Sequence, residues 1–480
     1  MAKLLIEEKE LLPKINAALR GWKNLSAISG EFIDNLLLVR EQRESLSASK
    51  NYIAAMRLAT NQVLHDGLEA LAEQDDTAAT ILRGRFVEDE KLVAIGHQLN
   101  MSEFSVSRRQ RDAIMALSQI IWQRELTARQ NWAKQLIDAL PHPTYSKLFG
   151  VQSAQQKLVD QLLDGEAPPI VAIEGIGGVG KTALADAVVR RVIQQFQFEH
   201  IAWVYVERPK TLSGRSESPR LTFEGILNTL ARKLWPQPPM NLSAEKLLEQ
   251  IRFKLKETPY LVVIDNLEAE SDLAYLLAQL PSLAVPSRFL LTTRVHPSSL
   301  QTAVYRHSLR ELPEPDATEL IYHYAESIGI DGIQEATDEH ILAIYQMTGG
   351  NPLALRLVVG LLDTLPLSHI LAGFLNNQVA EIESVYSRIY QQAWQTLSDN
   401  ARELLQAMPL VAETGATPDY LLAISGIDEN QFWPALNELR GRSLIEVRGS
   451  LLEKKYGIHR LTDSFLRNEV VFWPEEAEEE

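Results

Sequence analysis

The stretch "GIGGVGKTAL" (residues 175–184) lies between the apolar run "PIVAI" and the helix-like stretch "ADAVVRRVIQQF". It fits the spacing G-x-x-x-x-G-K-T, in which glycines let consecutive backbone N–H groups point at phosphate oxygens and the following helix adds its dipole. We expect Lys181 to reach the β- and γ-phosphates of a nucleotide and Thr182 to supply a hydroxyl to Mg²⁺. The predicted phosphate-binding residues are Gly175, Gly177, Gly178, Val179, Gly180, Lys181, Thr182 and Ala183. The competing interpretation is a glycine-rich turn that contains a lysine by chance.

Short β-rich apolar runs surround this stretch. They are "PPIVAIEGIGGVGKT", "HIAWVYVER", "PYLVVIDNLE" and "SRFLLTTR", and helix-like stretches such as "LTFEGILNTLARKLW" separate them. Strands that alternate with helices predict a parallel sheet with helices on both faces. We therefore expect four strands in an α/β nucleotide-binding domain over residues 145–300.

The run "YLVVIDNLE" offers the acidic groups of the predicted site. Asp265 is expected at the carboxyl end of a buried strand, where it would order Mg²⁺ together with Thr182. Glu268 is a candidate general base, and equally a solvated loop residue. Arg294 follows "SRFLLTT" and could contact the γ-phosphate, although a surface arginine at a strand end is the alternative. No N-K-x-D segment for guanine occurs, so adenine nucleotides, ATP or ADP, are expected.

The composition limits the class of protein. The 480 residues suffice for about three or four domains, and no apolar run approaches the roughly 18 residues that cross a bilayer. Cysteine is absent, which excludes disulfides and thiolate chemistry and fits a cytoplasmic protein without a membrane partner. The net charge of −16 disfavours non-specific binding to polyanions.

The periodicity divides the chain into further regions. Residues 1–140 carry apolar residues at helical spacing and end at the linker "PHPTY". Residues 311–377 are again helical, and residues 385–472 combine helices with a short hairpin and a final helix, a winged-helix pattern. Residues 473–480 form an acidic tail, which we expect to be solvated.

Several motifs together resemble the NB-ARC branch of the STAND signal-transduction ATPases. "IAWVYV" resembles the second strand of that family, "YLVVIDNLE" its Walker B segment and "SRFLLTTR" its sensor segment. "TGGNPLAL" resembles the motif whose proline, here Pro352, packs near adenine. "YGIHRL" resembles the winged-helix motif whose histidine, here His459, contacts the ADP β-phosphate. "LFGVQSAQQKL" resembles the adenine-cradling segment and brings in Leu148 and Phe149.

The resemblance covers residues 145–470 and implies a nucleotide switch. ADP would be held by the nucleotide-binding, helical and winged-helix domains together, and ATP would favour an open form that assembles into a homo-oligomer. Hydrolysis would be slow and would reset the switch. Taken without the resemblance, Pro352 is a common first residue of a helix, and a lone histidine such as His459 is a core residue.

Residues 81–121 resemble the helix-turn-helix of sigma factor region 4. Leu92, Ile95 and Leu99 would form the inner face of the first helix, Ser102 would begin the second helix, and Val106 would be buried. The exposed candidates for DNA contacts are Arg108, Arg109 and Arg111. The alternative is a helical protein-interaction module with a solvated arginine face.

Three functions are consistent with these patterns. The first is a nucleotide-switched regulator whose helix-turn-helix acts on DNA or on the transcription machinery. The second is an interaction scaffold in stress or antiviral defence, where the N-terminal helices recruit an effector or a separate sensor. The third, an ATPase motor or metabolic enzyme, is disfavoured because Asn266 stands where a second acidic residue would follow Asp265.

Overall fold

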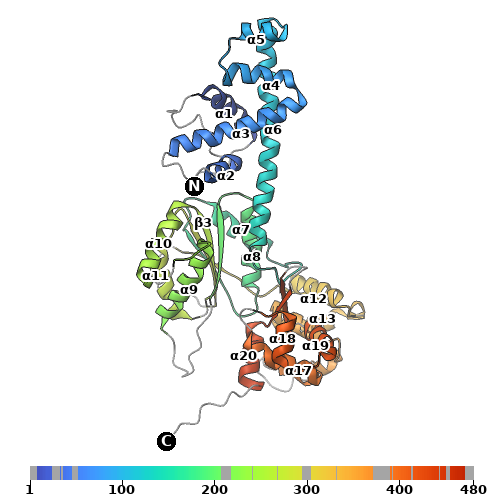
Figure 1. The fold of residues 1–480 in the computed structure, drawn as a ribbon. Coiled ribbons are helices and arrows are strands. Elements are labelled where there is room, and N and C mark those ends of the chain that lie inside the picture. Colours follow the sequence, from blue (N-terminus) through green and yellow to red (C-terminus); the bar gives the residue numbers. More distant parts are fainter. Residues whose placement is uncertain are drawn as a thin grey trace. The chain divides into compact units, whose positions relative to one another are not determined.

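The computed structural model describes most of the chain (Figure 1). The described residues are 8–23, 33, 36–45, 52–206, 218–239, 242–267, 269–294, 304–330, 332–370, 390–391, 393–411, 415–442, 444–449 and 454–470. They form two compact units. The N-terminal unit comprises Ala2–Ala139 and Ile193–Phe198, and the C-terminal unit comprises Leu140–Val192 and Glu199–Glu480. Glu268 and the acidic tail 473–480 lie outside the described residues.

The described part of the N-terminal unit is helical, as its periodicity predicts. Its helices are α1 (Glu8–Arg20), α2 (Leu37–Ser45), α3 (Tyr52–Gln74), α4 (Asp76–Leu82), the π turn η1 (Arg83–Val87), α5 (Leu92–Leu99) and α6 (Glu103–Asp138). One hydrophobic cluster joins α1, α2, α3, α4 and α6, with Leu19, Leu64 and Leu117 fully buried. The unit therefore has a core of its own.

Helix α6 extends beyond the predicted helix-turn-helix. The resemblance to that motif covers residues 81–121, whereas α6 has 36 residues and continues to Asp138. No glycine or proline interrupts the sequence before Pro141, so nothing stops the helix earlier. At its start, the hydroxyl of Ser102 accepts a hydrogen bond from the Ser105 N–H, as predicted for the first residue of the second helix.

The C-terminal unit contains a parallel sheet with five strands. They are β1 (Ile170–Glu174), β2 (His200–Tyr205), β3 (Tyr260–Leu267), β4 (Arg288–Thr293) and β5 (Val304–Ser308), in the order β2-β3-β4-β1-β5. Four of them, β1 to β4, coincide with the four predicted runs, whereas β5 lies beyond residue 300 and was not predicted, because it reads "VYRHS" and is half-buried at the sheet edge. A strand of this kind lacks the continuous apolar run that identified the others.

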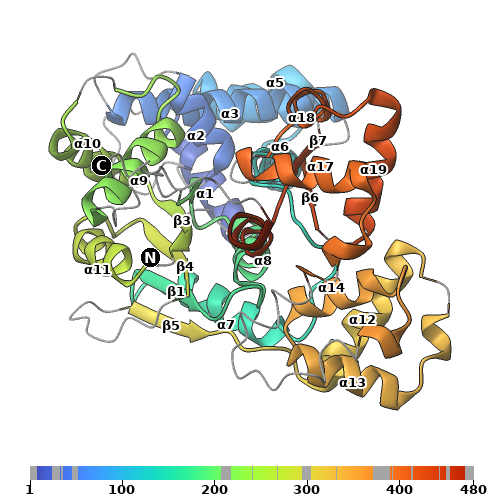
Figure 2. The ribbon, with the colours of Figure 1, turned by 90° about the horizontal axis from the view of Figure 1, so that it is seen from below.

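Helices cover both faces of this sheet, as expected. Helices α9 (Pro219–Leu234), α10 (Ala244–Glu257) and α11 (Glu270–Gln279) bury their apolar residues against one face. Helices α7 (Gln152–Leu163) and α8 (Lys181–Ile193) lie on the opposite side (Figures 1 and 2). The carboxyl ends of β1, β3 and β4 therefore meet next to the start of α8, which is where a parallel sheet places its ligand.

The rest of the C-terminal unit is mostly helical. Its elements are α12 (Glu314–Ile328), α13 (Asp338–Thr348), α14 (Pro352–Leu361), α17 (Asp399–Ala407), α18 (Pro418–Ser425), α19 (Glu429–Gly441), the antiparallel strands β6 (Glu446–Gly449) and β7 (Lys454–Gly457), and α20 (Arg460–Phe465). Short turns η2 (Leu280–Ser282), η3 (Ile333–Glu335), η4 (Met408–Leu410) and η5 (Leu466–Val470) complete the described elements. A single hydrophobic cluster extends from α12 to α20, so Pro352 and the turn after β7 are supported by the same core.

Candidate functional site

The glycine-rich loop connects β1 to α8, as the sequence predicts. Lys181 is the first residue of α8, and its Nζ donates hydrogen bonds of 2.9 Å to the carbonyl oxygens of Gly175 and Ile176. Gly178 and Gly180 have φ values of 74° and 101°, a backbone region that favours glycine. The loop thus has the curled form that points backbone N–H groups at an anion at the start of a helix.

Gly175 has a different use from the other glycines of the loop. A Cβ atom at this position would lie 2.6 Å from the carbonyl oxygen of Leu309, which is too close. The Leu309 N–H also donates a hydrogen bond of 2.8 Å to the carbonyl oxygen of Glu174. Gly175 therefore allows the chain after β5 to approach the loop, and it does not line the pocket with the other predicted residues.

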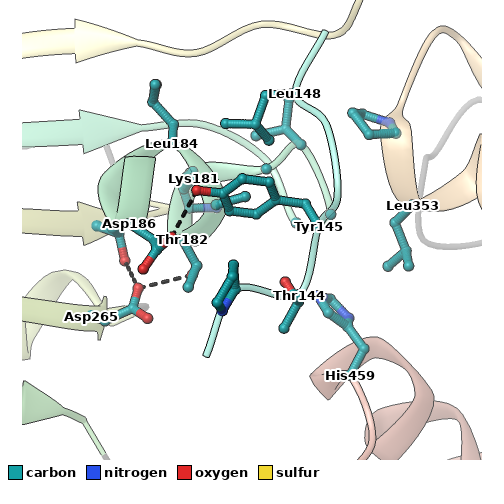
Figure 3. Close-up of a pocket in the computed structure, with 18 of the residues that line it drawn as sticks. Thr144, Tyr145, Leu148, Lys181, Thr182, Leu184, Asp186, Asp265, Leu353 and His459 are labelled. Carbon is teal, nitrogen blue, oxygen red and sulfur yellow. Dashed lines mark hydrogen bonds between the residues drawn. The ribbon is translucent and has the colours of Figure 1, made fainter. Parts of the chain in front are cut away.

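Thr182 and Asp265, the two predicted oxygen ligands of Mg²⁺, lie next to each other, and their role as ligands stays a prediction. The Thr182 hydroxyl donates to Asp265 Oδ1 at 2.9 Å, and the Thr292 hydroxyl donates to the same oxygen (Figure 3). Asp265 is buried, and β3 continues two residues beyond it through an irregular register in which Asn266 has a φ of 76°. A hydroxyl and a buried carboxylate are hard oxygen donors of the kind that Mg²⁺ prefers.

Arg294 follows β4 and lies against the glycine-rich loop. A Cβ on Gly177 would be 3.1 Å from the guanidinium carbon of Arg294, so a larger residue there would require this flexible side chain to move by a few tenths of an ångström. Arg294 lines the pocket. This position agrees with the predicted contact to a γ-phosphate, which itself stays a prediction. The candidate base Glu268 is not among the described residues, and its role stays a prediction too.

The start of α14 contacts the loop through residues that the sequence analysis did not single out. Asn351 Nδ2 donates to the carbonyl oxygen of Gly177 at 3.0 Å, and the Leu353 N–H donates to the carbonyl oxygen of Gly178 at 3.3 Å. Pro352, between them, is the first residue of α14 and lines the pocket. The signal in the sequence was "NP", since asparagine commonly precedes a helix and proline commonly begins one.

The segment between α6 and α7 forms another wall of the pocket. Leu148 and Phe149, which are predicted to cradle adenine, line it, and so does Tyr145, which was not predicted. The Tyr145 hydroxyl donates a hydrogen bond of 2.7 Å to Asp186 on α8 (Figure 3). Burial, helped by the adjacent Asp186 carboxylate, raises the pKa of Tyr145 well above its usual range. The phenol therefore keeps its proton and remains a hydrogen-bond donor.

His459 closes the described pocket from the side of the β6–β7 pair. It follows β7, and together with Ile458 it lines the same cavity as the glycine-rich loop (Figure 3). The cavity has a volume of about 370 Å³, within the range of small-molecule sites. Predicted residues that line it are Leu148, Phe149, Gly177, Gly178, Val179, Gly180, Lys181, Thr182, Ala183, Asp265, Arg294, Pro352 and His459.

The arginines that were predicted to contact DNA are exposed on α6. Arg108, Arg109 and Arg111 all face solvent, while Val106 is fully buried, as expected. Arg109 Nη2 lies 3.7 Å from Asp75 Oδ2, an ion pair that partly neutralises this residue. Ile95 is buried and Leu92 and Leu99 pack beside it, so α5 has the predicted inner face.

A parallel sheet, a glycine-rich loop before a helix, and a buried Asp265 next to Thr182 define a P-loop nucleotide-binding protein. Residues 151–327 match the family model described as "NB-ARC domain". This part of the chain is therefore similar to the NB-ARC domain and has the P-loop nucleotide-binding fold.

The similar curated proteins are plant disease proteins. The chain is 26% identical over 304 residues to the "Putative inactive disease susceptibility protein LOV1" of Arabidopsis thaliana, covering 60% of this chain and 38% of that protein. It is 27% identical over 239 residues to the "Disease resistance protein RGA5" of Oryza sativa subsp. japonica, covering 48% of this chain and 20% of that protein. The chain thus spans 38% or less of the length of these relatives.

Solved structures with a related arrangement were also found. One is a STAND protein with a tetratricopeptide repeat sensor from Pyrococcus horikoshii, with a TM-score of 0.45 and 19% identity, covering 68% of this chain and 43% of that chain. Another is the ORC2 protein of Aeropyrum pernix, with a TM-score of 0.35 and 15% identity, covering 69% and 97% of the two chains. Within the described residues, no helix combines the length and the apolar character needed to cross a membrane.

Proposed function

We propose that this protein is an ATP/ADP-switched signalling NTPase of the defence type, whose N-terminal helices recruit an effector. The single observation that supports the switch is that segments far apart in the sequence together form the wall of one pocket. The glycine-rich loop, the start of α14 at Pro352 and the turn at His459 all contribute to one cavity. A ligand that touches three segments of the chain stabilises the arrangement in which they meet.

The proposed resting state holds ADP. Lys181 and the loop N–H groups would bind the β-phosphate, Pro352 and Phe149 would contact the base, and His459 would add a contact to the phosphates. A γ-phosphate would have to share the space beside Gly177 with the Arg294 guanidinium. ATP then favours a more open arrangement only through its differential affinity for the two states. Hydrolysis returns the protein to the ADP form.

Mg²⁺ fits the donors at the proposed site. Thr182 and Asp265 would hold the ion, which would supply positive charge to neutralise the phosphates. The chain's own contribution is to fix the orientation of the Asp265 carboxylate, which the Thr292 hydroxyl does from the neighbouring strand. Asn266 cannot remove a proton from water, which supports slow turnover.

The defence assignment is supported by the names of the relatives, which are disease resistance and disease susceptibility proteins. These relatives favour the scaffold over the transcriptional regulator. We therefore place recruitment of an effector first. Self-association in the ATP state is part of the proposal, because assembly would bring several copies of the N-terminal unit together and raise their effective concentration.

The experiment that tests the switch is to denature the purified protein and identify the released nucleotide by chromatography. We expect about one ADP per chain, and none in the Lys181→Ala variant. The His459→Ala variant should still bind ADP but exchange it faster, whereas His97→Ala, an exposed histidine on α5, serves as the control. Empty protein that turns over ATP steadily would contradict the switch and indicate an ordinary ATPase.

Transcriptional regulation is the second candidate. It is favoured by α5 and the start of α6, where a short turn at Asn100 joins two helices and Arg108 and Arg111 are exposed. A helix-turn-helix of this kind reads DNA with its second helix. Binding to duplex DNA that weakens with salt and with Arg108→Ala would support it. If the protein binds no DNA in either nucleotide state, the transcriptional candidate is contradicted and the scaffold remains as the proposed function.

A further inference from the structure

The first three turns of α6 carry an exposed stripe with both apolar and basic residues. Its members are Phe104, Arg108, Arg111 and Met115, which follow one another at intervals of four, three and four residues. At 3.6 residues per turn these positions fall within an arc of about 60° and extend over about 16 Å. We call this set the α6 stripe.

The α6 stripe is exposed although two of its members are large and apolar. Phe104 is 77% exposed and Met115 is 47% exposed. The opposite face of the same helix is the one that packs, since Val106, Ala113 and Leu117 are buried. Single exposed hydrophobic residues are common, but a phenylalanine and a methionine aligned with two arginines on one helix face are a feature of interaction surfaces.

The two arginines of the stripe keep their charge available. Within the described part of the chain, the guanidinium groups of Arg108 and Arg111 form neither an ion pair nor a hydrogen bond. Arg109, which points to another side of α6, differs in this respect because it pairs with Asp75. The stripe therefore presents two positive charges between two apolar ends.

The spacing of the stripe indicates the shape of its partner. Intervals of four and three residues are those of the a and d positions in a heptad, where one helix packs its side chains between those of another. A charged residue at such a position selects an opposite charge on the facing helix. We propose that the α6 stripe binds an amphipathic helix of a separate protein, with apolar residues facing Phe104 and Met115 and acidic residues facing Arg108 and Arg111.

A protein helix fits this surface better than DNA does. Glu103 and Asp112 are exposed on either flank of the stripe and would repel phosphates on both sides. Phe104, the most exposed large hydrophobic residue of the described chain, lies at the end of the stripe where a DNA-reading helix would approach the bases. The proposal rests on the proposed recruitment function and gives it a specific site.

The test uses the full chain and two synthetic peptides labelled with fluorescein. Both are three-heptad helices with leucine opposite Phe104 and Met115; the acidic probe has glutamate opposite the arginines and the basic probe has lysine. Fluorescence anisotropy is expected to show saturable binding of the acidic probe and binding of the basic probe that is weaker by about tenfold or more, a difference of about 1.4 kcal/mol.

Variants separate the stripe from general charge. Phe104→Ala and Arg108→Glu should each weaken the acidic probe about tenfold, whereas Lys134→Glu, the same charge change on an exposed part of α6, should not. The double variant Arg108→Glu/Arg111→Glu should prefer the basic probe. This reversal shows that the variant is folded, so loss of binding is not read as unfolding.

Three outcomes would overturn the proposal. The first is that the acidic probe shows no saturable binding. The second is that Lys134→Glu and Arg108→Glu weaken binding of this probe equally. The third is that a 20-base-pair DNA duplex displaces the probe, binds more tightly and responds to the variants in the same way. The nucleotide released from the same preparation is measured in parallel. Bound ADP without probe binding would contradict the proposed binding site on the α6 stripe and leave the nucleotide switch supported. Probe binding without bound ADP would contradict the switch and support the binding site.

Discussion

Asn351 joins α14 to the glycine-rich loop with both ends of its carboxamide. Its Nδ2 donates to the carbonyl oxygen of Gly177 at 3.0 Å, and its Oδ1 accepts from the Leu353 and Ala354 N–H groups at the start of the helix. One side chain thus begins a helix and fixes a loop that is 174 residues away in the sequence.

These two roles can be separated by substitution. Asn351→Ser retains an oxygen that begins the helix but loses the donor to Gly177, while Asn351→Ala loses both. We expect both variants to show a smaller rise in melting temperature on adding ADP, because the loop is held less firmly. Asn351→Ala should also lose about 1 kcal/mol of stability without ADP. An unchanged ADP effect in both variants, measured by thermal denaturation, would argue against this coupling.

The Thr182–Asp265 pair predicts how metal removal affects nucleotide binding. Chelation with EDTA should weaken binding of ATP to the wild-type protein, because the phosphates would lose the cation that neutralises their charge. Thr182→Ala should reduce this metal effect about tenfold and leave metal-independent binding through Lys181 in place. Thr182→Ser, which keeps the hydroxyl, is the control. Titration calorimetry with and without Mg²⁺ measures both; equal metal dependence in all three proteins would remove Thr182 as a ligand.

Glu125 predicts a stability effect confined to the N-terminal unit. This buried carboxylate of α6 accepts hydrogen bonds from Leu37 and Leu38 at the start of α2, and Arg129 Nε lies 2.8 Å from it. Glu125→Ala should destabilise the unit by about 3 kcal/mol, because it leaves buried partners without their acceptor.

The milder change Glu125→Gln tests whether charge matters there, since it keeps the size and one acceptor oxygen. It should fall between the wild-type protein and Glu125→Ala in chemical denaturation. Nucleotide content should be the same in all three proteins, as Glu125 is no part of the pocket. Equal stability of the three would contradict a capping role for this residue.

His307 on β5 predicts a loss of stability in mild acid. Burial, with Lys157 as a second cause, lowers the pKa of His307 below its usual range. The unfolded chain therefore takes up the proton first as the pH falls, so this contribution is complete above about pH 6.5 and declines as the pH falls toward the lowered pKa.

The His307→Gln variant should accordingly lose less stability than the wild-type protein between about pH 7 and pH 5. Lys157→Gln, which removes only the second cause, should have a smaller effect in the same direction. Urea denaturation at a series of pH values measures the slopes. A steeper slope in His307→Gln than in the wild type would show that the sign is wrong.

The sequence predicted the elements whose physical signal is local. The strand before Gly175 and the strand that contains Asp265 are continuous apolar runs, since both of their faces are buried. The start of α6 was predicted from Ser102, because a serine hydroxyl before a helix commonly accepts a hydrogen bond from a backbone N–H of the first turn. For the same reason the glycine-rich loop and its lysine were visible from spacing alone.

Elements that depend on contacts between distant residues were missed. Strand β5 is defined by its pairing with β1, because its sequence VYRHS begins with two apolar residues and continues with three polar ones. The bond from Tyr145 to Asp186 spans 41 residues, and no spacing rule connects them. The contribution of Asn351 was equally hidden, because an asparagine before a proline indicates the start of a helix and says nothing of what its amide contacts.

Helix α8 also has a mechanical role. Lys181 is its first residue, and further along it Arg190 Nη2 donates to the carbonyl oxygen of Pro141 at 2.8 Å while Asp186 holds Tyr145 at 2.7 Å. A force applied to the chain before Pro141 would act first on the Arg190–Pro141 hydrogen bond and then on the Tyr145–Asp186 hydrogen bond. Residues 148 and 149, which line the pocket, come after both attachments along the chain. Helix α8 thus anchors the segment that leads into the pocket at two points before the chain reaches the pocket wall.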